Sequence, residues 1–190
     1  MSDNELNLRS ALAQRGALLD GHFRLSSGRH SNRFVQKFRI LEDPMLLEPV
    51  ARAIADRFRA SSPTIVVGSA VGGILLAYEV ARHLGTKAIF VEKENGVPAL
   101  RRGFALSAAD RALIVEDVVT TGLSVREVID VVRGRGAEIV GIGVIILRGS
   151  GEFGVTTDAL LELPLESYDE RECPQCRDGE PVTDPGSRRA

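Results

Sequence analysis

Residues 112–124 read Ala112-Leu113-Ile114-Val115-Glu116-Asp117-Val118-Val119-Thr120-Thr121-Gly122-Leu123-Ser124, and this stretch decides the fold. Four apolar residues, typical of a buried parallel strand, lead into two adjacent carboxylates and a hydroxyl-rich turn. Apolar residues then recur at helical spacing over residues 125–132. The turn is therefore predicted to join the carboxyl end of a strand to the amino end of a helix.

This turn has the residues of a ribose-phosphate site. Ligands of open α/β sheets bind at the carboxyl ends of the strands, and amides at a helix start attract phosphate. Thr120, Thr121 and Ser124 add hydroxyl donors. Glu116 and Asp117 would repel a phosphate but suit sugar hydroxyls or Mg²⁺, which prefers oxygen ligands. A structural alternative stays open, because carboxylates before a helix are also favoured by its dipole.

Length and composition indicate a compact globular protein. The chain has 190 residues, 44% of them hydrophobic, which favours a single domain over residues 1–190. The net charge of −2 provides no general attraction to nucleic acid or an acidic membrane. No apolar run approaches the ~18 residues that span a bilayer, and residues 1–5 lack the features of a signal peptide. We therefore expect a cytoplasmic protein that binds neither nucleic acid nor membrane.

The remaining pattern predicts a parallel sheet preceded by a smaller region. Helical patterns over residues 74–84 and 125–132 alternate with strand candidates at 64–68, 88–91, 112–115 and 139–147. This alternation predicts right-handed βαβ units. The first 60 residues indicate a helical region through Leu19, a turn at Asp20-Gly21, extended segments over 21–35 and a helix from Pro44 to Phe58. A short strand is expected at 159–163, followed by loops or a flexible end.

The strand at 64–68 ends in a second glycine-rich turn, Gly68-Ser69-Ala70-Val71-Gly72-Gly73. The turn lacks the Lys-Ser/Thr of a P-loop and the spacing of a dinucleotide-binding turn. Its three glycines would allow the backbone to approach a ligand closely.

The stretch at 112–124 resembles the signature of the type I phosphoribosyltransferases, which consists of four apolar residues, two acids, two variable positions and a Thr/Ser- and Gly-rich loop. The resemblance implies a central, mostly parallel sheet flanked by helices (about 61–165), an N-terminal hood (about 1–60) and a C-terminal tail (about 166–190). It implies 5-phosphoribosyl 1-diphosphate as donor, Mg²⁺ as cofactor and a homodimer that shares a loop across its interface. The implied donor contacts are Glu116, Asp117, Val118, Val119, Thr120, Thr121, Gly122, Leu123 and Ser124, with Gly72 and Gly73 in the diphosphate loop.

Residues 21–31 resemble the G-x-F-x-L-x-S-G-x-x-S segment of the orotate phosphoribosyltransferase family, and the resemblance runs from about residue 5 to residue 150. It implies transfer of the phosphoribosyl group to orotate, giving orotidine 5′-phosphate and diphosphate in de novo pyrimidine biosynthesis. Thr120 and Arg148 fall where that family contacts orotate. A guanidinium can pair bidentately with the orotate carboxylate. By itself, Arg148 could also be a solvated charge at a strand end.

Lys93 matches a lysine at the start of the family's mobile catalytic loop, so the resemblance assigns catalysis to Lys93 and Asp117. Residues 95–98 are typical of a mobile loop. The chain lacks the later loop lysine and histidine, and it has Ser26, Gly72 and Leu123 where many members have lysine, lysine and glycine. We hypothesise that Arg101 or Arg102 supplies the missing positive charge. These departures also fit a shorter-loop branch of the family.

Cys173 and Cys176, the only cysteines, are spaced C-x-x-C in a polar segment. We favour two reduced surface cysteines, because a structural zinc site needs four ligands. The alternative is a zinc site with four thiolates, shared by a symmetric dimer.

Two rival functions remain. A phosphoribosyltransferase for another base would keep both loops without needing Arg148. A regulator that senses the donor or a nucleotide could keep the fold without catalysis, but the chain has no basic cluster for DNA.

Overall fold

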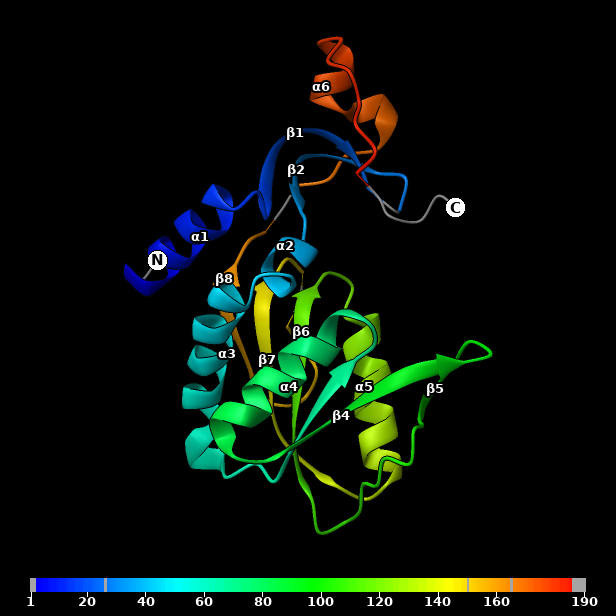
Figure 1. Cartoon of the computed structure of the whole chain (residues 1–190). Coiled ribbons are helices and arrows are strands. Elements are labelled where there is room, and N and C mark those ends of the chain that lie inside the picture. The colour runs from blue at the N-terminus through cyan, green and yellow to red at the C-terminus, as the bar shows by residue number, and fades with distance from the viewer. Residues whose placement is uncertain (1–2, 26, 150, 165, 186–190) are drawn as a thin grey trace. The chain divides into compact units, whose positions relative to one another are not determined.

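The computed structural model describes residues 3–25, 27–149, 151–164 and 166–185 (Figure 1). The chain divides into two compact units. The smaller unit comprises Met1–Arg39 together with Pro164–Ala190, and the larger unit comprises Ile40–Leu163. The grouping of the C-terminal segment with the N-terminal residues is a tertiary feature that no local pattern indicated. That the chain acts as a single domain stays a prediction, and Ser26 lies outside the described residues.

The larger unit is built on one six-stranded sheet of order β5-β4-β3-β6-β7-β8. All neighbouring strands pair in parallel except β4 and β5, which are antiparallel. The predicted α/β class with a mostly parallel sheet is thus confirmed. The strands are β3 (Ile65–Ser69), β4 (Lys87–Glu94), β5 (Val97–Leu100), β6 (Arg111–Val119), β7 (Glu138–Leu147) and β8 (Thr157–Glu162).

Helices cover both faces of this sheet. The apolar stripe of α5 (Leu123–Gly134) packs in one core cluster with alternate residues of β3, β6 and β7. On the opposite face, Gly141 and Gly143 of β7 leave room for Phe58 and Ile54, respectively. These two side chains belong to α3 (Pro44–Phe58), so α3 and α5 lie on opposite faces of the sheet. The other helical segments of this unit are α4 (Gly72–Leu84), the 3-10 turn Arg59–Ser61 and α2 (Phe38–Leu41), which crosses the unit boundary.

The helix predicted from Pro44 to Phe58 forms as α3 (Pro44–Phe58). Its start is capped, since the Asp43 side chain accepts a hydrogen bond from Met45 N at 2.9 Å. Proline at the first helical position costs no internal hydrogen bond. The local sequence is therefore sufficient to place this helix.

Two segments of the larger unit differ from the predicted pattern. β6 continues beyond Val115 to Val119, because Glu116, Val118 and Val119 pair with β7. Residues 95–98, expected as a mobile loop, contain the turn of the β4–β5 hairpin, which projects from the sheet in Figure 1. Asn95 and Gly96 at this turn have φ angles of 51° and 81°. Such positive values are typical of a tight hairpin turn.

The smaller unit contains α1 (Asp3–Gln14) and an antiparallel pair, β1 (Leu18–Arg24) and β2 (His30–Val35). Leu19, predicted in a helix, lies in β1, and the predicted turn at Asp20-Gly21 is a register irregularity within that strand. The C-terminal segment forms a 3-10 turn (Glu170–Glu172) and the short helix α6 (Pro174–Arg177). Leu18 and Leu19 pair with Val35 and Phe34 of β2. This pairing replaces the helical structure that was predicted through Leu19.

Among the described residues, no helix combines the length and apolar character needed to cross a bilayer.

Candidate active site

The turn after β6 borders an open pocket at the carboxyl end of the sheet. Its walls come from the end of β6, the turn and the first residues of α5. The pocket therefore lies where the sequence predicted a ribose-phosphate site. Its lining residues are Glu116, Val118, Val119, Thr120, Thr121, Gly122, Leu123, Ser124 and Val125.

The two carboxylates belong to the strand itself. Glu116 and Asp117 are only 5% and 1% exposed, and alternation along β6 directs neighbouring side chains to opposite faces. Glu116 Oε2 accepts a hydrogen bond from Ser69 Oγ at 2.5 Å, and Asp117 Oδ1 accepts one from Val118 N at 2.6 Å. These contacts hold both carboxylates in fixed positions beside the turn.

Close packing fixes the path of the turn. Gly122 has a φ of 76°, and a Cβ there would lie 2.6 Å from the Phe153 ring. A Cβ on Gly149 would lie 2.0 Å from the carbonyl oxygen of Thr120. Larger residues at either position would displace the turn, so the chain after β7 supports the pocket from its side.

Arg148 follows β7 directly and lies next to the turn. Its backbone N donates a 2.8 Å hydrogen bond to Val119 O, the last residue of β6. Its Nε is buried and has no hydrogen-bond partner among the described residues. Burial lowers the pKa of the guanidinium from its ordinary value, although an arginine with such a high reference pKa stays charged at neutral pH. A partly buried cation with an unsatisfied buried donor suits an anionic ligand.

The glycine-rich turn before α4 has a packing role that the sequence did not indicate. A Cβ on Gly68 would lie 2.2 Å from Gly73 O, and one on Gly73 would lie 3.2 Å from Gly68 Cα. The strand and helix backbones therefore touch at this pair. Ala70 N donates to Val91 O at 2.8 Å, which ties the turn to β4. The assignment of Gly72 and Gly73 to the diphosphate remains a prediction.

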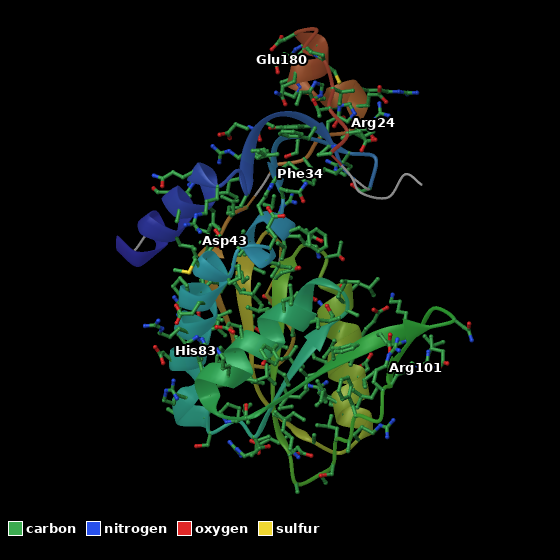
Figure 2. All side chains as sticks on the ribbon, viewed as in Figure 1. Arg24, Phe34, Asp43, His83, Arg101 and Glu180 are labelled. Carbon is green, nitrogen blue, oxygen red and sulfur yellow. The ribbon has the colours of Figure 1, made fainter. Side chains whose placement is uncertain are left out.

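The predicted loop cations lie along the β4–β5 hairpin. Lys93 Nζ donates to Glu127 Oε1 of α5 at 2.7 Å. Figure 2 shows Arg101 at this hairpin, where it pairs with Glu94 at 3.2 Å. Arg102 binds both oxygens of Glu92, at 2.7 and 3.0 Å, and lowers the pKa of that carboxyl. These exposed pairs leave the catalytic assignment of Lys93 and the compensating role of Arg101 or Arg102 as predictions.

Three residues at the site were missed by sequence reasoning. Ser69 holds Glu116, Glu127 holds Lys93, and Phe153 restricts Gly122. Ser69 lay in the glycine-rich turn, so its place at a strand end could have been a signal. No signal in the sequence marks Glu127 or Phe153, because they reach the site only through the packing of α5 and of the chain after β7.

Comparisons with known proteins agree with this geometry. The phosphoribosyl transferase domain family matches residues 39–160. The orotate phosphoribosyltransferase of Desulforamulus reducens is 49% identical over 175 residues, which cover 91% of this chain and 92% of that protein. The orotate phosphoribosyltransferase of Thermotoga petrophila is 46% identical over 183 residues, covering 95% and 98%, respectively.

A solved structure supports the same relationship. The crystal structure of orotate phosphoribosyltransferase from Aeropyrum pernix superposes with a TM-score of 0.70 at 29% identity, covering 82% of this chain and 93% of that one. The identities of 49% and 46% to the Desulforamulus and Thermotoga proteins, over almost the full length, are much more specific than a shared fold. The chain therefore belongs to the orotate phosphoribosyltransferase family and has the type I phosphoribosyltransferase fold.

Proposed function

We propose that this protein transfers the phosphoribosyl group of 5-phosphoribosyl 1-diphosphate to orotate. The products are orotidine 5′-phosphate and diphosphate, and the reaction is a step of de novo pyrimidine biosynthesis. Membership of the orotate phosphoribosyltransferase family supports this activity. The polar end of β6 and the following turn supply the chemistry that the donor requires.

The partly buried side chain of Arg148, with its buried Nε, is the observation that carries the choice of base. Its backbone adjoins the end of β6, and its Nε has no hydrogen-bond partner among the described residues. A carboxylate would neutralise its charge and accept its donors, whereas an uncharged base would leave the charge unpaired. Orotate carries such a carboxylate. Thr120, whose carbonyl lies close to Gly149, is proposed as a second orotate contact.

The donor would be held by two sets of groups. Residues 120–124, with their hydroxyls at the start of α5, would bind the 5-phosphate. Glu116 and Asp117 would accept hydrogen bonds from the ribose hydroxyls. The glycine-rich turn with Gly72 and Gly73, together with Lys93, would bind the diphosphate.

The residues at the end of β6 fit Mg²⁺ by their chemistry. Glu116 and Asp117 are buried carboxylates, and Glu116 lies beside the Ser69 hydroxyl; all of these groups offer oxygen ligands. We propose that they hold the ion directly or through water, with oxygens of the donor completing its shell. When bound, Mg²⁺ supplies positive charge that stabilises the diphosphate leaving group.

Catalysis would rest on positioning and charge. The bond between C1 of the ribose and the diphosphate oxygen breaks, and its electron pair leaves with the diphosphate. An orotate nitrogen then forms the new bond to the cationic C1 centre and loses its proton, which the departing diphosphate accepts. Asp117 and Glu116 would keep the ribose in place, while Arg148 would orient the base. Excluding water from the pocket would protect this centre from hydrolysis.

The decrease in orotate ultraviolet absorbance with donor and Mg²⁺ tests the proposal. We expect Arg148→Ala to lower kcat/KM for orotate ~10²-fold, since a charged hydrogen-bonded pair contributes about 3 kcal/mol. Arg148→Lys should recover only part of the loss, because lysine lacks the planar fork. The matched control is Arg52→Ala, which removes an exposed arginine of α3 that pairs with Glu48.

Each other outcome has a defined meaning. Turnover of another base in place of orotate would contradict the proposed substrate and favour a related transferase. Donor binding without turnover of any base would favour the sensing regulator. A homodimer that shares the Lys93 loop and a cytoplasmic location remain parts of the proposal, and activity as a function of protein concentration tests the former.

A further inference from the structure

Four potential metal ligands meet in the smaller unit, and the proposed reaction uses none of them. They are His22, His30, Cys173 and Cys176, and their ligand atoms all lie within 4.8 Å of one another. The first three are buried, with Cys173 only 2% exposed. The expectation of two surface cysteines is therefore wrong for Cys173, because the chain folds this segment against the β1–β2 pair.

The distances between the ligand atoms fit a tetrahedral centre. His22 Nε2 lies 2.9 Å from His30 Nδ1, 3.5 Å from Cys173 Sγ and 3.6 Å from Cys176 Sγ. His30 Nδ1 lies 3.1 Å from Cys176 Sγ. Usual zinc bond lengths at a tetrahedral angle place two nitrogens ~3.3 Å apart and a nitrogen and a sulfur ~3.6 Å apart. Four of the six distances between ligand atoms are therefore within ~0.5 Å of those around one zinc ion. The other two distances, between Cys173 Sγ and either His30 Nδ1 or Cys176 Sγ, do not exceed 4.8 Å.

Backbone hydrogen bonds bring the C-terminal segment to both strands that carry the histidines. Tyr168 and His30 exchange two bonds of 2.8 Å at the edge of β2. Thr183 N donates to His22 O at 2.7 Å, and Arg24 N donates to Thr183 O at 2.9 Å. Cys173 and Cys176 lie in the chain between these two anchors. Bonds outside the cluster therefore hold both ends of this segment against the strands that carry the histidines.

A hydrogen bond outside the cluster prepares His22 for metal binding. His22 Nδ1 lies 2.9 Å from Glu180 O, a backbone carbonyl that can only accept, so Nδ1 carries the proton. Nε2 then presents its lone pair to the cluster. Figure 2 labels Glu180 in the C-terminal segment that carries the cysteines. A bond from the second ring nitrogen to a carbonyl is the usual support of a metal-bound histidine.

We propose that this cluster is a structural zinc site, completed within one chain by His22 Nε2, His30 Nδ1, Cys173 Sγ and Cys176 Sγ. Zn²⁺ displaces the two thiol protons and forms four bonds, two to nitrogen and two to thiolate sulfur. The two thiolates balance the charge of the ion, so the buried site is neutral overall. Four protein ligands close the coordination shell and leave no position for a substrate.

The smaller unit has a physical need for such a site. Its sheet has two strands, and a two-stranded sheet with little apolar core is marginally stable in water. A metal that joins β1, β2 and the C-terminal segment would stabilise the unit in the way that small domains use metals. The shared four-thiolate site considered from sequence is replaced, because two histidines of the same chain supply the missing ligands.

The zinc content of the purified full chain, measured by mass spectrometry of the elements, tests the proposal. We expect one zinc per chain in protein prepared without chelators. Cys176→Ser and His22→Ala should each lower the content at least tenfold. His83→Gln is the matched control, since His83 is the third histidine of the chain and lies on α4, as labelled in Figure 2.

A second measurement on the unaltered chain covers the case in which the variants fail to fold. Alkylation of Cys173 and Cys176 should be at least tenfold slower than after treatment with a zinc chelator, and added Zn²⁺ should restore the protection. Replacement of zinc by Co²⁺ should produce the visible absorption of a tetrahedral thiolate site. A chain that holds no metal after incubation with Zn²⁺, or one that is lighter by two hydrogens because of a disulfide, would overturn the proposal.

Discussion

Different interactions stabilise each of the two units of this protein. The larger unit is a six-stranded sheet with helices on both faces, and the pocket of its proposed site is lined from one stretch of the chain, within residues 116–125. The smaller unit has a two-stranded sheet, and its four-residue cluster joins positions 22 and 30 to positions 173 and 176. The first arrangement relies on buried apolar surface, whose stabilising free energy is proportional to the area buried. The second relies on a few specific bonds between distant parts of the chain.

Because of this difference, we expect the turn after β6 and the four-residue cluster to respond to different perturbations. A change at the end of β6 should affect the reaction and leave the cluster unaltered. Removal of the proposed zinc should affect the smaller unit and leave the sheet of the larger unit folded. Changes confined to one unit therefore separate effects on the reaction from effects on the stability of the smaller unit.

The largest effect is expected from chelation of zinc. Amides of residues 18–24 and 30–35 should lose ~10³-fold of their protection from hydrogen exchange, about 4 kcal/mol, because metal binding energy is folding energy in a small unit. Amides of β3 and β6 should keep their protection. Hydrogen exchange followed by mass spectrometry measures both in one sample. Uniform loss across the two units would show that they are stabilised as one body and would remove the contrast.

Asp117→Asn should lower kcat/KM about 10²-fold. The amide keeps the shape of the side chain but loses the charge that would accept hydrogen bonds from ribose hydroxyls, worth about 3 kcal/mol. Steady-state turnover of orotate measures the effect, and zinc content should be unchanged. Asp130→Asn, an exposed change on α5, is the control. Unchanged kinetics in Asp117→Asn would remove this residue from the site.

Gly68→Ala should destabilise the larger unit by about 2–3 kcal/mol. The new Cβ would lie 2.2 Å from Gly73 O, so β3 and α4 would have to separate. Gly134→Ala is the matched control, because no atom lies within 4 Å of its added Cβ and alanine favours a helix. Urea unfolding monitored by circular dichroism would compare the two. Equal midpoints would contradict the backbone contact as a constraint on the glycine-rich turn.

Arg102→Ala should have the smallest effect, a decrease in turnover of about fivefold, near 1 kcal/mol. The exposed pair with Glu92 contributes little to stability, so unfolding by urea should barely change. The same measurement on Arg101→Ala tests the other candidate cation. If neither variant alters turnover, the hairpin does not replace the charge missing from the loop.

Local patterns predicted the elements whose partners are close in sequence. The helices at 44–58 and 125–132 follow from apolar spacing, and the strand at 112–115 from a short apolar run. The Asn95-Gly96 pair was also a local signal for a hairpin, and reading residues 95–98 as a loop overlooked it. The extension of β6 through Glu116 and Asp117 had no such signal, because pairing with β7 decides it.

The amino-acid sequence was sufficient to predict the α/β class and the family, and it supplies the residues of the proposed phosphate turn. All three depend on neighbouring residues whose periodicity and chemistry are visible along the chain. Only the packing of distant segments places Arg148 beside Val119 with a buried Nε, brings Gly68 against Gly73, and joins two histidines to two cysteines. The physical reason is that burial and ligand geometry depend on which distant segments pack together, and a local pattern does not record that choice.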